Sequence, residues 1–135
     1  MRKIHVIKPQ ETISPGSRKV VYSTEKRSKL AFYILKTDSP DLTIITRVRV
    51  PLPNIITWEE VSFSLSDLYG YGLVNNMCPN PKLPCISVWD DTNRKYVVIF
   101  SPTEGEEFPH GFELVLRNPT SSRVTISMVM VVYEP

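Results

Sequence analysis

The sequence predicts an all-β protein, an antiparallel β-sandwich of eight or nine strands. One observation is a strict alternation of apolar and polar residues, clearest where Val61, Phe63 and Leu65 alternate with serines. A second is that such segments are separated by clusters of Asp, Asn, Pro and Ser, the residues of tight turns. A third is that no stretch of ten residues carries an apolar stripe at helical spacing. The one helical turn expected is at Glu59 and Glu60.

The N-terminal residues 1–17, with Pro9, Pro15 and Gly16, predict an extended arm in front of a single domain over residues 18–135. One domain is expected because a chain of 135 residues falls within the usual domain size of about 100–200 residues. Within the arm, Ile4, His5, Val6 and Ile7 form a strand-like segment. This segment could pair with its own sheet or exchange onto the edge of another subunit.

The expected strands follow one another with turn clusters between them, notably at Thr37–Asp41, Asp90–Asn93 and Asn118–Ser122. In chain order the strands are Lys19–Thr24, Leu30–Lys36, Leu42–Val50, Ile55–Trp58, Val61–Ser66, Cys85–Trp89, Tyr96–Ser101, Phe112–Arg117 and Val124–Tyr133.

Two segments, Leu30–Leu35 and Met128–Tyr133, are apolar on both faces. We expect both to be central strands, covered by another sheet or by a neighbouring subunit. The long connections Asp67–Pro84 and Pro102–Gly111 are expected to cross between the sheets at one end of the sandwich. Such crossovers favour a jelly roll.

The formal net charge of +2 conceals an uneven distribution. Residues 1–50 carry eleven Lys or Arg and four Asp or Glu, whereas residues 51–135 carry five and ten. This split suits a basic surface for nucleic acid or complementary patches on neighbouring subunits, unless both halves interleave in one domain and the charges mix. The candidate basic patch consists of Arg18, Lys19, Lys26, Arg27 and Lys29.

Cys78 and Cys85 flank a loop that contains three prolines. A disulfide between them would stabilise the fold by roughly 2–3 kcal/mol, and two free thiols are the alternative in a reducing compartment. Zinc binding needs four ligands, which the two cysteines and the distant His5 and His110 do not supply at a zinc-finger spacing.

Catalytic motifs are missing from the sequence: it contains no GxSxG, HExxH or phosphate-binding glycine loop. The acidic pairs Glu59–Glu60, Asp90–Asp91 and Glu106–Glu107 lie in expected turns, where solvated carboxylates are ordinary. We therefore expect no enzyme, no metal and no cofactor. No apolar run is longer than the six residues of Met128–Tyr133, so no membrane span is expected, and Lys8 and Pro9 interrupt any apolar signal core.

The aromatic residues Tyr69, Tyr71, Trp89 and Tyr96 sit in loops or at strand ends. Exposed rings there could stack on sugars or anchor a protein partner, whereas buried rings would close the ends of the core.

The predicted layout resembles small viral jelly-roll proteins, whose single sandwich uses an arm and end loops to contact its neighbours. The resemblance covers about residues 18–134 at the level of fold. It implies a non-enzymatic structural subunit that self-associates into a capsid, vertex or decoration, located in the virion rather than free in the cytoplasm. The alternative is a carbohydrate- or receptor-binding module that uses the four loop aromatics.

Overall fold

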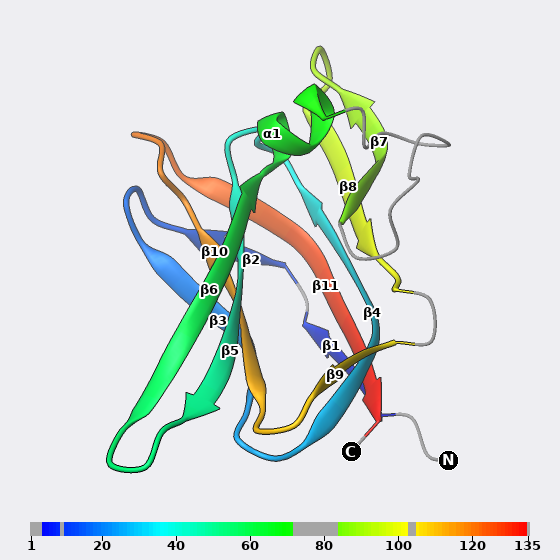
Figure 1. The fold of residues 1–135 in the computed structure, drawn as a ribbon. Helices are drawn as coiled ribbons and strands as arrows, with labels where there is room; N and C mark the ends of the chain where they lie inside the picture. The colour runs from blue at the N-terminus through cyan, green and yellow to red at the C-terminus, as the bar shows by residue number, and fades with distance from the viewer. Residues whose placement is uncertain (1–3, 9, 72–83, 103–104, 135) are drawn as a thin grey trace.

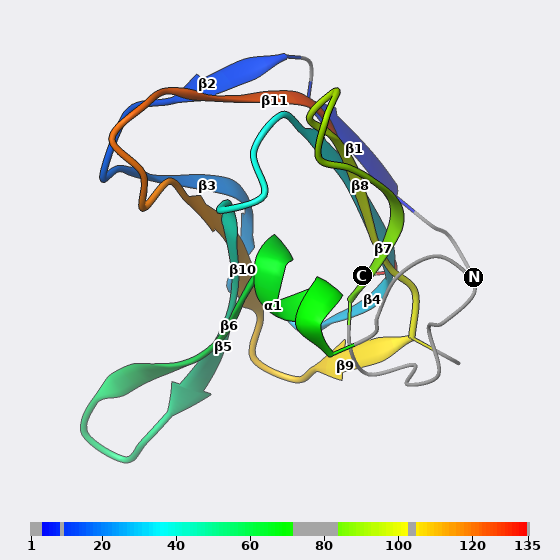
Figure 2. The same ribbon diagram turned by 90° about the horizontal axis from the view of Figure 1, so that it is seen from above.

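In the part of the chain that the structure describes, eleven strands form two antiparallel sheets that pack face to face, and one short helix accompanies them (Figures 1 and 2). The structure is a computed structural model, and it describes residues 4–8, 10–71, 84–102 and 105–134. The larger sheet contains β1 (Ile4–Lys8), β2 (Glu11–Ile13), β4 (Ser28–Thr37), β7 (Cys85–Asp90), β8 (Lys95–Phe100), β9 (Glu106–Phe108) and β11 (Val124–Glu134). The smaller contains β3 (Arg18–Thr24), β5 (Thr43–Pro51), β6 (Ile56–Ser64) and β10 (Phe112–Arg117).

The order of strands interleaves the two ends of the chain. The larger sheet runs β1-β11-β4-β8-β7, with β2 also on β11 and β9 also on β4, and the smaller runs β3-β10-β5-β6. The all-β sandwich predicted from the sequence is therefore confirmed. The two-faced segments form β4 and β11, which are interior strands of the larger sheet, as expected.

The core lies between the sheets and is built by the alternation seen in the sequence. Ile44 of β5 is buried while Thr43 is not, and Leu42, directly before the strand, is also buried. On β4, Tyr33 and Leu35 point inward and are no more than 1% exposed. Each such side chain contributes about 1.5–3 kcal/mol by leaving water, so the period-two pattern fixes which face of each sheet packs inward.

The segment Ile56–Ser64 differs from the prediction, because it is one continuous strand rather than two. Glu59 and Glu60 continue the ladder opposite Val48 and Arg47 of β5, and the guanidinium of Arg47 neutralises Glu60. The helical turn expected at the two glutamates was wrong. The helix α1 (Leu65–Gly70) begins directly after β6 instead.

Two short strands were not expected, and the long connections differ from the prediction in their placement. β2 has three residues and pairs with the start of β11, and β9 has three residues within the 102–111 connection. Both long connections cross between the sheets as predicted. However, α1 and β9 lie at opposite ends of the sandwich, so the connections do not share one end (Figure 1).

The arm predicted over residues 1–17 lies, where the structure describes it, within the sandwich. Ile4–Lys8 pairs antiparallel with Tyr133–Val129 of β11 in the same chain, as the edge strand of the larger sheet. Of the two placements expected for this segment, the structure shows pairing with its own sheet. Within the described residues the single helix has six residues, which is too short to cross a bilayer.

Candidate functional site

The helix α1 positions the first of the candidate aromatic residues. Ser64 caps it: the Ser64 Oγ accepts a hydrogen bond from the Asp67 backbone N–H at 3.0 Å, and Asp67 Oδ2 accepts one from the Ser64 N–H at 3.3 Å. Leu65 and Leu68 are fully buried against the end of the core. Tyr69 is consequently turned outward and is 53% exposed.

Three of the four predicted aromatic residues come together. The rings of Tyr69 and Trp89 stack at a centroid distance of 4.9 Å and an angle of 26°. Trp89 also meets Tyr96 at 4.6 Å. Tyr71 is exposed and makes no ring contact with the residues that the structure describes. We call Tyr69, Trp89 and Tyr96 the aromatic cluster.

Tyr96 is the buried member of this cluster. Its hydroxyl donates a hydrogen bond to Asp91 Oδ1 at 3.1 Å. Burial, followed by this bond to the carboxylate, raises the pKa of Tyr96 to about 12. The hydroxyl therefore stays protonated and ties the rings to the turn between β7 and β8.

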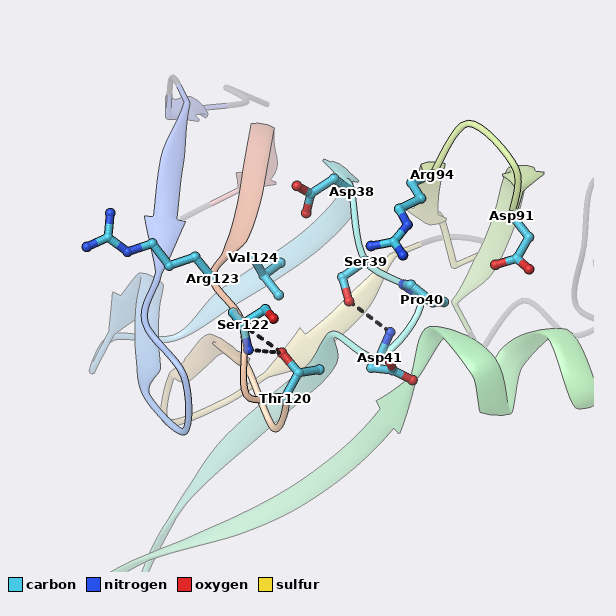
Figure 3. Close-up of a pocket in the computed structure, with 10 residues that line it drawn as sticks. All are labelled: Asp38, Ser39, Pro40, Asp41, Asp91, Arg94, Thr120, Ser122, Arg123 and Val124. Atoms are coloured by element: carbon cyan, nitrogen blue, oxygen red, sulfur yellow. Dashed lines mark hydrogen bonds between the residues drawn. The ribbon is translucent and has the colours of Figure 1, made fainter.

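That turn borders a cavity of about 320 Å³ at the same end of the molecule (Figure 3). Three loops form its walls: β4–β5, β7–β8 and β10–β11. We call it the end cavity, and its lining residues are Asp38, Ser39, Pro40, Asp41, Asp91, Arg94, Thr120, Ser122, Arg123 and Val124.

Asn118 fixes the β10–β11 wall of the end cavity. Its side chain is fully buried, and its Nδ2 donates to the carbonyl oxygens of Ile13 at 3.0 Å and Ser122 at 2.7 Å. Its Oδ1 accepts from the backbone N–H of Thr120 at 3.0 Å and from the Thr120 hydroxyl at 2.6 Å. A single amide therefore joins the first strands of the chain to this loop.

A different surface, the outer face of the larger sheet, is apolar. Phe32 and Ile34 of β4 alternate with the buried Tyr33 and Leu35, and they do not pack against the core. Ile99 of β8 lies in register with Ile34, and Val97 lies two residues before it on the same face. These four side chains are half-buried, and Val88 of β7 is 46% exposed, whereas Val132 of β11, opposite Phe32, is fully buried. Figure 2 shows the smaller sheet and α1 on the opposite side of this sheet. We call Phe32, Ile34, Val88, Val97 and Ile99 the outer apolar face.

Three of the five residues of the candidate basic patch form ion pairs within the chain. Arg18 lies 3.3 Å from Glu60, Lys19 lies 3.2 Å from Glu11, and Arg27 pairs with Glu107. Lys26 and Lys29 form no ion pair with another described residue. Arg18 and Arg27 from the first part of the chain thus meet glutamates from the second, as expected if the two halves interleave, whereas Lys19 meets Glu11 from its own half.

The acidic pairs likewise have structural partners. The Arg27 guanidinium bonds the Glu107 carboxylate and holds the pKa of Glu107 below its usual range. The Asn93 backbone N–H, and then its side chain, lower the pKa of Asp90 in the β7–β8 turn. The described residues include no group of three His, Cys, Asp or Glu side chains that could hold a metal.

Cys78 lies outside the described residues, so the predicted Cys78–Cys85 disulfide stays a prediction. Cys85 itself is buried at the start of β7 and is not a free thiol. His110, exposed beside Gly111, has no catalytic partner among the described residues. Neither a protein-family model nor a curated protein matches this sequence.

Proposed function

We propose that the protein is a structural subunit that self-associates through the outer apolar face of its larger sheet. The observation that carries the proposal is a sheet with two apolar faces, of which the sandwich covers one. Contiguous apolar side chains left on the surface of a small protein usually mark a protein contact, because their exposure to water is unfavourable. Two sheets can pack face to face about 10 Å apart through such side chains.

Charge at the rim supports a second copy as the occupant. Lys36 and Lys95 border the face at the end near the β7–β8 turn, whereas Glu134 borders it at the end of β11. None of the three forms an ion pair with another described residue. A two-fold axis perpendicular to the strands would bring the lysines of one copy to the glutamate of the other.

The strand order supports a viral jelly-roll interpretation. The chain crosses between sheets from β2 to β3, β3 to β4 and β4 to β5, and again from β6 to β7, β9 to β10 and β10 to β11. Two interlocked Greek keys give this kind of alternation in a jelly roll. We propose on this basis a capsid, vertex or decoration subunit of a virion, with no enzymatic activity.

The test is the native mass by size exclusion with light scattering. Ile34→Glu introduces a charge into the centre of the outer apolar face, and we expect it to convert an oligomer into a folded monomer. Ser62→Glu places the same group on the exposed face of the other sheet and should leave the mass unchanged. A wild-type protein that is monomeric at high concentration, or an Ile34→Glu oligomer of unchanged mass, would refute self-association through this face.

A second candidate function is a binding module, and the stacked Tyr69 and Trp89 favour it. A rigid pair of rings with one member half exposed is a common platform for a sugar or a protein loop. Trp89 gives the measurement, since a ligand that covers the stack should change its fluorescence. Glycan-array silence combined with unchanged fluorescence in the presence of glycans would dismiss this function.

A further inference from the structure

The end cavity is a preorganised hollow rather than a loose gap between loops. In the β4–β5 loop, the Asp41 N–H donates to Ser39 Oγ at 3.2 Å, and Asp38 Oδ1 accepts from the Thr125 N–H at 3.0 Å. The Asn118 amide holds the facing β10–β11 loop. Because its walls are fixed before any ligand arrives, binding there would cost little ordering of the protein.

Arg94 lines the cavity with an unusual backbone conformation and with a side chain that has no partner among the described residues. Its backbone φ of 52° lies in the left-handed region, which favours Gly, Asn or Asp in a hairpin turn. Its guanidinium forms no hydrogen bond or ion pair with another described residue. In Figure 3 it extends from the β7–β8 turn toward Ser39 and Pro40, whereas the Arg123 guanidinium points away. An arginine held in a strained turn without an internal partner suits a ligand contact.

The lining excludes strongly charged ligands. Three carboxylates, those of Asp38, Asp41 and Asp91, would repel an anion, and the Arg94 guanidinium would repel a cation. The described residues offer no metal site. What remains is a polar wall that both donates hydrogen bonds, from Arg94 and the Ser39 and Ser122 hydroxyls, and accepts them, at Asp41. A neutral ligand with many hydroxyl groups matches both kinds of partner.

The aromatic cluster adds an apolar platform next to this polar wall. Asp91 lines the cavity and accepts the Tyr96 hydroxyl, which places the stacked rings of Trp89 and Tyr69 on the adjacent surface. A sugar ring has an apolar C–H face and a polar edge. Stacking on Tyr69 and hydrogen bonding to the cavity would satisfy both parts of such a ligand.

We infer that the end cavity, together with Tyr69, binds a neutral saccharide. This inference rests on the second candidate function and names its site and ligand class. Arg94 and Asp41 would hold neighbouring hydroxyl groups of the sugar, while Tyr69 would cover its apolar face. Self-association through the outer apolar face uses a separate surface, so both activities fit one molecule.

The experiment is a glycan array of neutral and acidic glycans, followed by titration calorimetry with the best neutral ligand. Arg94→Gly removes the guanidinium and relieves the strained backbone. We expect affinity to fall about tenfold or more, since a charged hydrogen-bond donor is lost, while the melting temperature stays equal or rises. Arg117→Ala, at an exposed arginine of β10, is the matched control and should bind as the wild type does.

Each other outcome counts against a defined part of the inference. If the wild type binds no glycan, both the binding function and the site fall. If it binds and Tyr69→Ala abolishes binding while Arg94→Gly and Asp41→Asn do not, the binding function stands and the cavity is excluded. Binding of acidic glycans alone would overturn the neutral ligand class.

Discussion

Replacing Asn118 with alanine tests whether one buried amide holds the two ends of the chain together. The substitution removes the four side-chain hydrogen bonds of Asn118, and the Ile13 carbonyl then loses a donor in a buried region. At a net value of about 0.5–1.5 kcal/mol each, four bonds sum to about 2–6 kcal/mol. The Thr120 hydroxyl still reaches the Ser122 carbonyl at 2.9 Å, so one acceptor remains satisfied.

We therefore expect Asn118→Ala to lower the free energy of unfolding by about 3 kcal/mol, a large share of the 5–15 kcal/mol typical of a domain. For a chain of this size that corresponds to a fall of roughly 10–15 °C in melting temperature. Urea unfolding followed by circular dichroism measures the free energy. Asn93→Ala is the control, because the Asn93 side chain makes one exposed bond, to Asp90 at 2.7 Å. A loss below about 1 kcal/mol for Asn118→Ala, or an equal loss in the control, would refute the reasoning.

Three further outcomes follow from the structure. Burial raises the pKa of the Tyr33 hydroxyl, so the stability that this group contributes is present below its unfolded pKa of about 10 and is lost at higher pH. Tyr33→Phe should therefore flatten the alkaline decline in the free energy of unfolding. Declines of equal slope in the wild type and the variant would contradict this. Gly111 has a φ of 96°, and a Cβ added there would lie 2.1 Å from the backbone oxygen of Thr24. Gly111→Ala should therefore lower the free energy of unfolding by several kcal/mol, on the order of the largest point-mutant effects. Gly70→Ala, with nothing within 4 Å of the added atom, should be neutral or slightly stabilising in thermal unfolding. If Cys78 and Cys85 form a disulfide, iodoacetamide will label neither under denaturing conditions unless reductant is added, and labelling without reductant would exclude the bond.

The strands could be predicted because their residues alternate locally. Phe112–Arg117 was predicted with its observed bounds, and the two-faced character of Leu30–Leu35 predicted the apolar side chains that β4 places on the outer face of the larger sheet. The joining of the strands around Glu59 and Glu60 could not be predicted, because it depends on the cross-strand pairing of Glu60 with Arg47.

The candidate site was predicted in part. Tyr69, Trp89 and Tyr96 were selected by residue type and position near turns, and the structure groups them. Their neighbour Tyr71 was selected on the same ground and stays apart. The end cavity was not predicted, since its three loops are distant in sequence and meet only through the strand order. The signal in the sequence was an arginine at a turn position where glycine or asparagine is usual.

The central place of β11 constrains how the protein can be made. β11 follows the other described strands in the sequence, yet it lies between β1 and β4 and also pairs with β2. While the ribosome is still translating the preceding residues, these three strands lack the neighbour to which they are hydrogen-bonded in the finished sheet. The larger sheet therefore closes only after translation has passed Glu134, and nascent chains stalled before that point should be protease-sensitive and prone to aggregate.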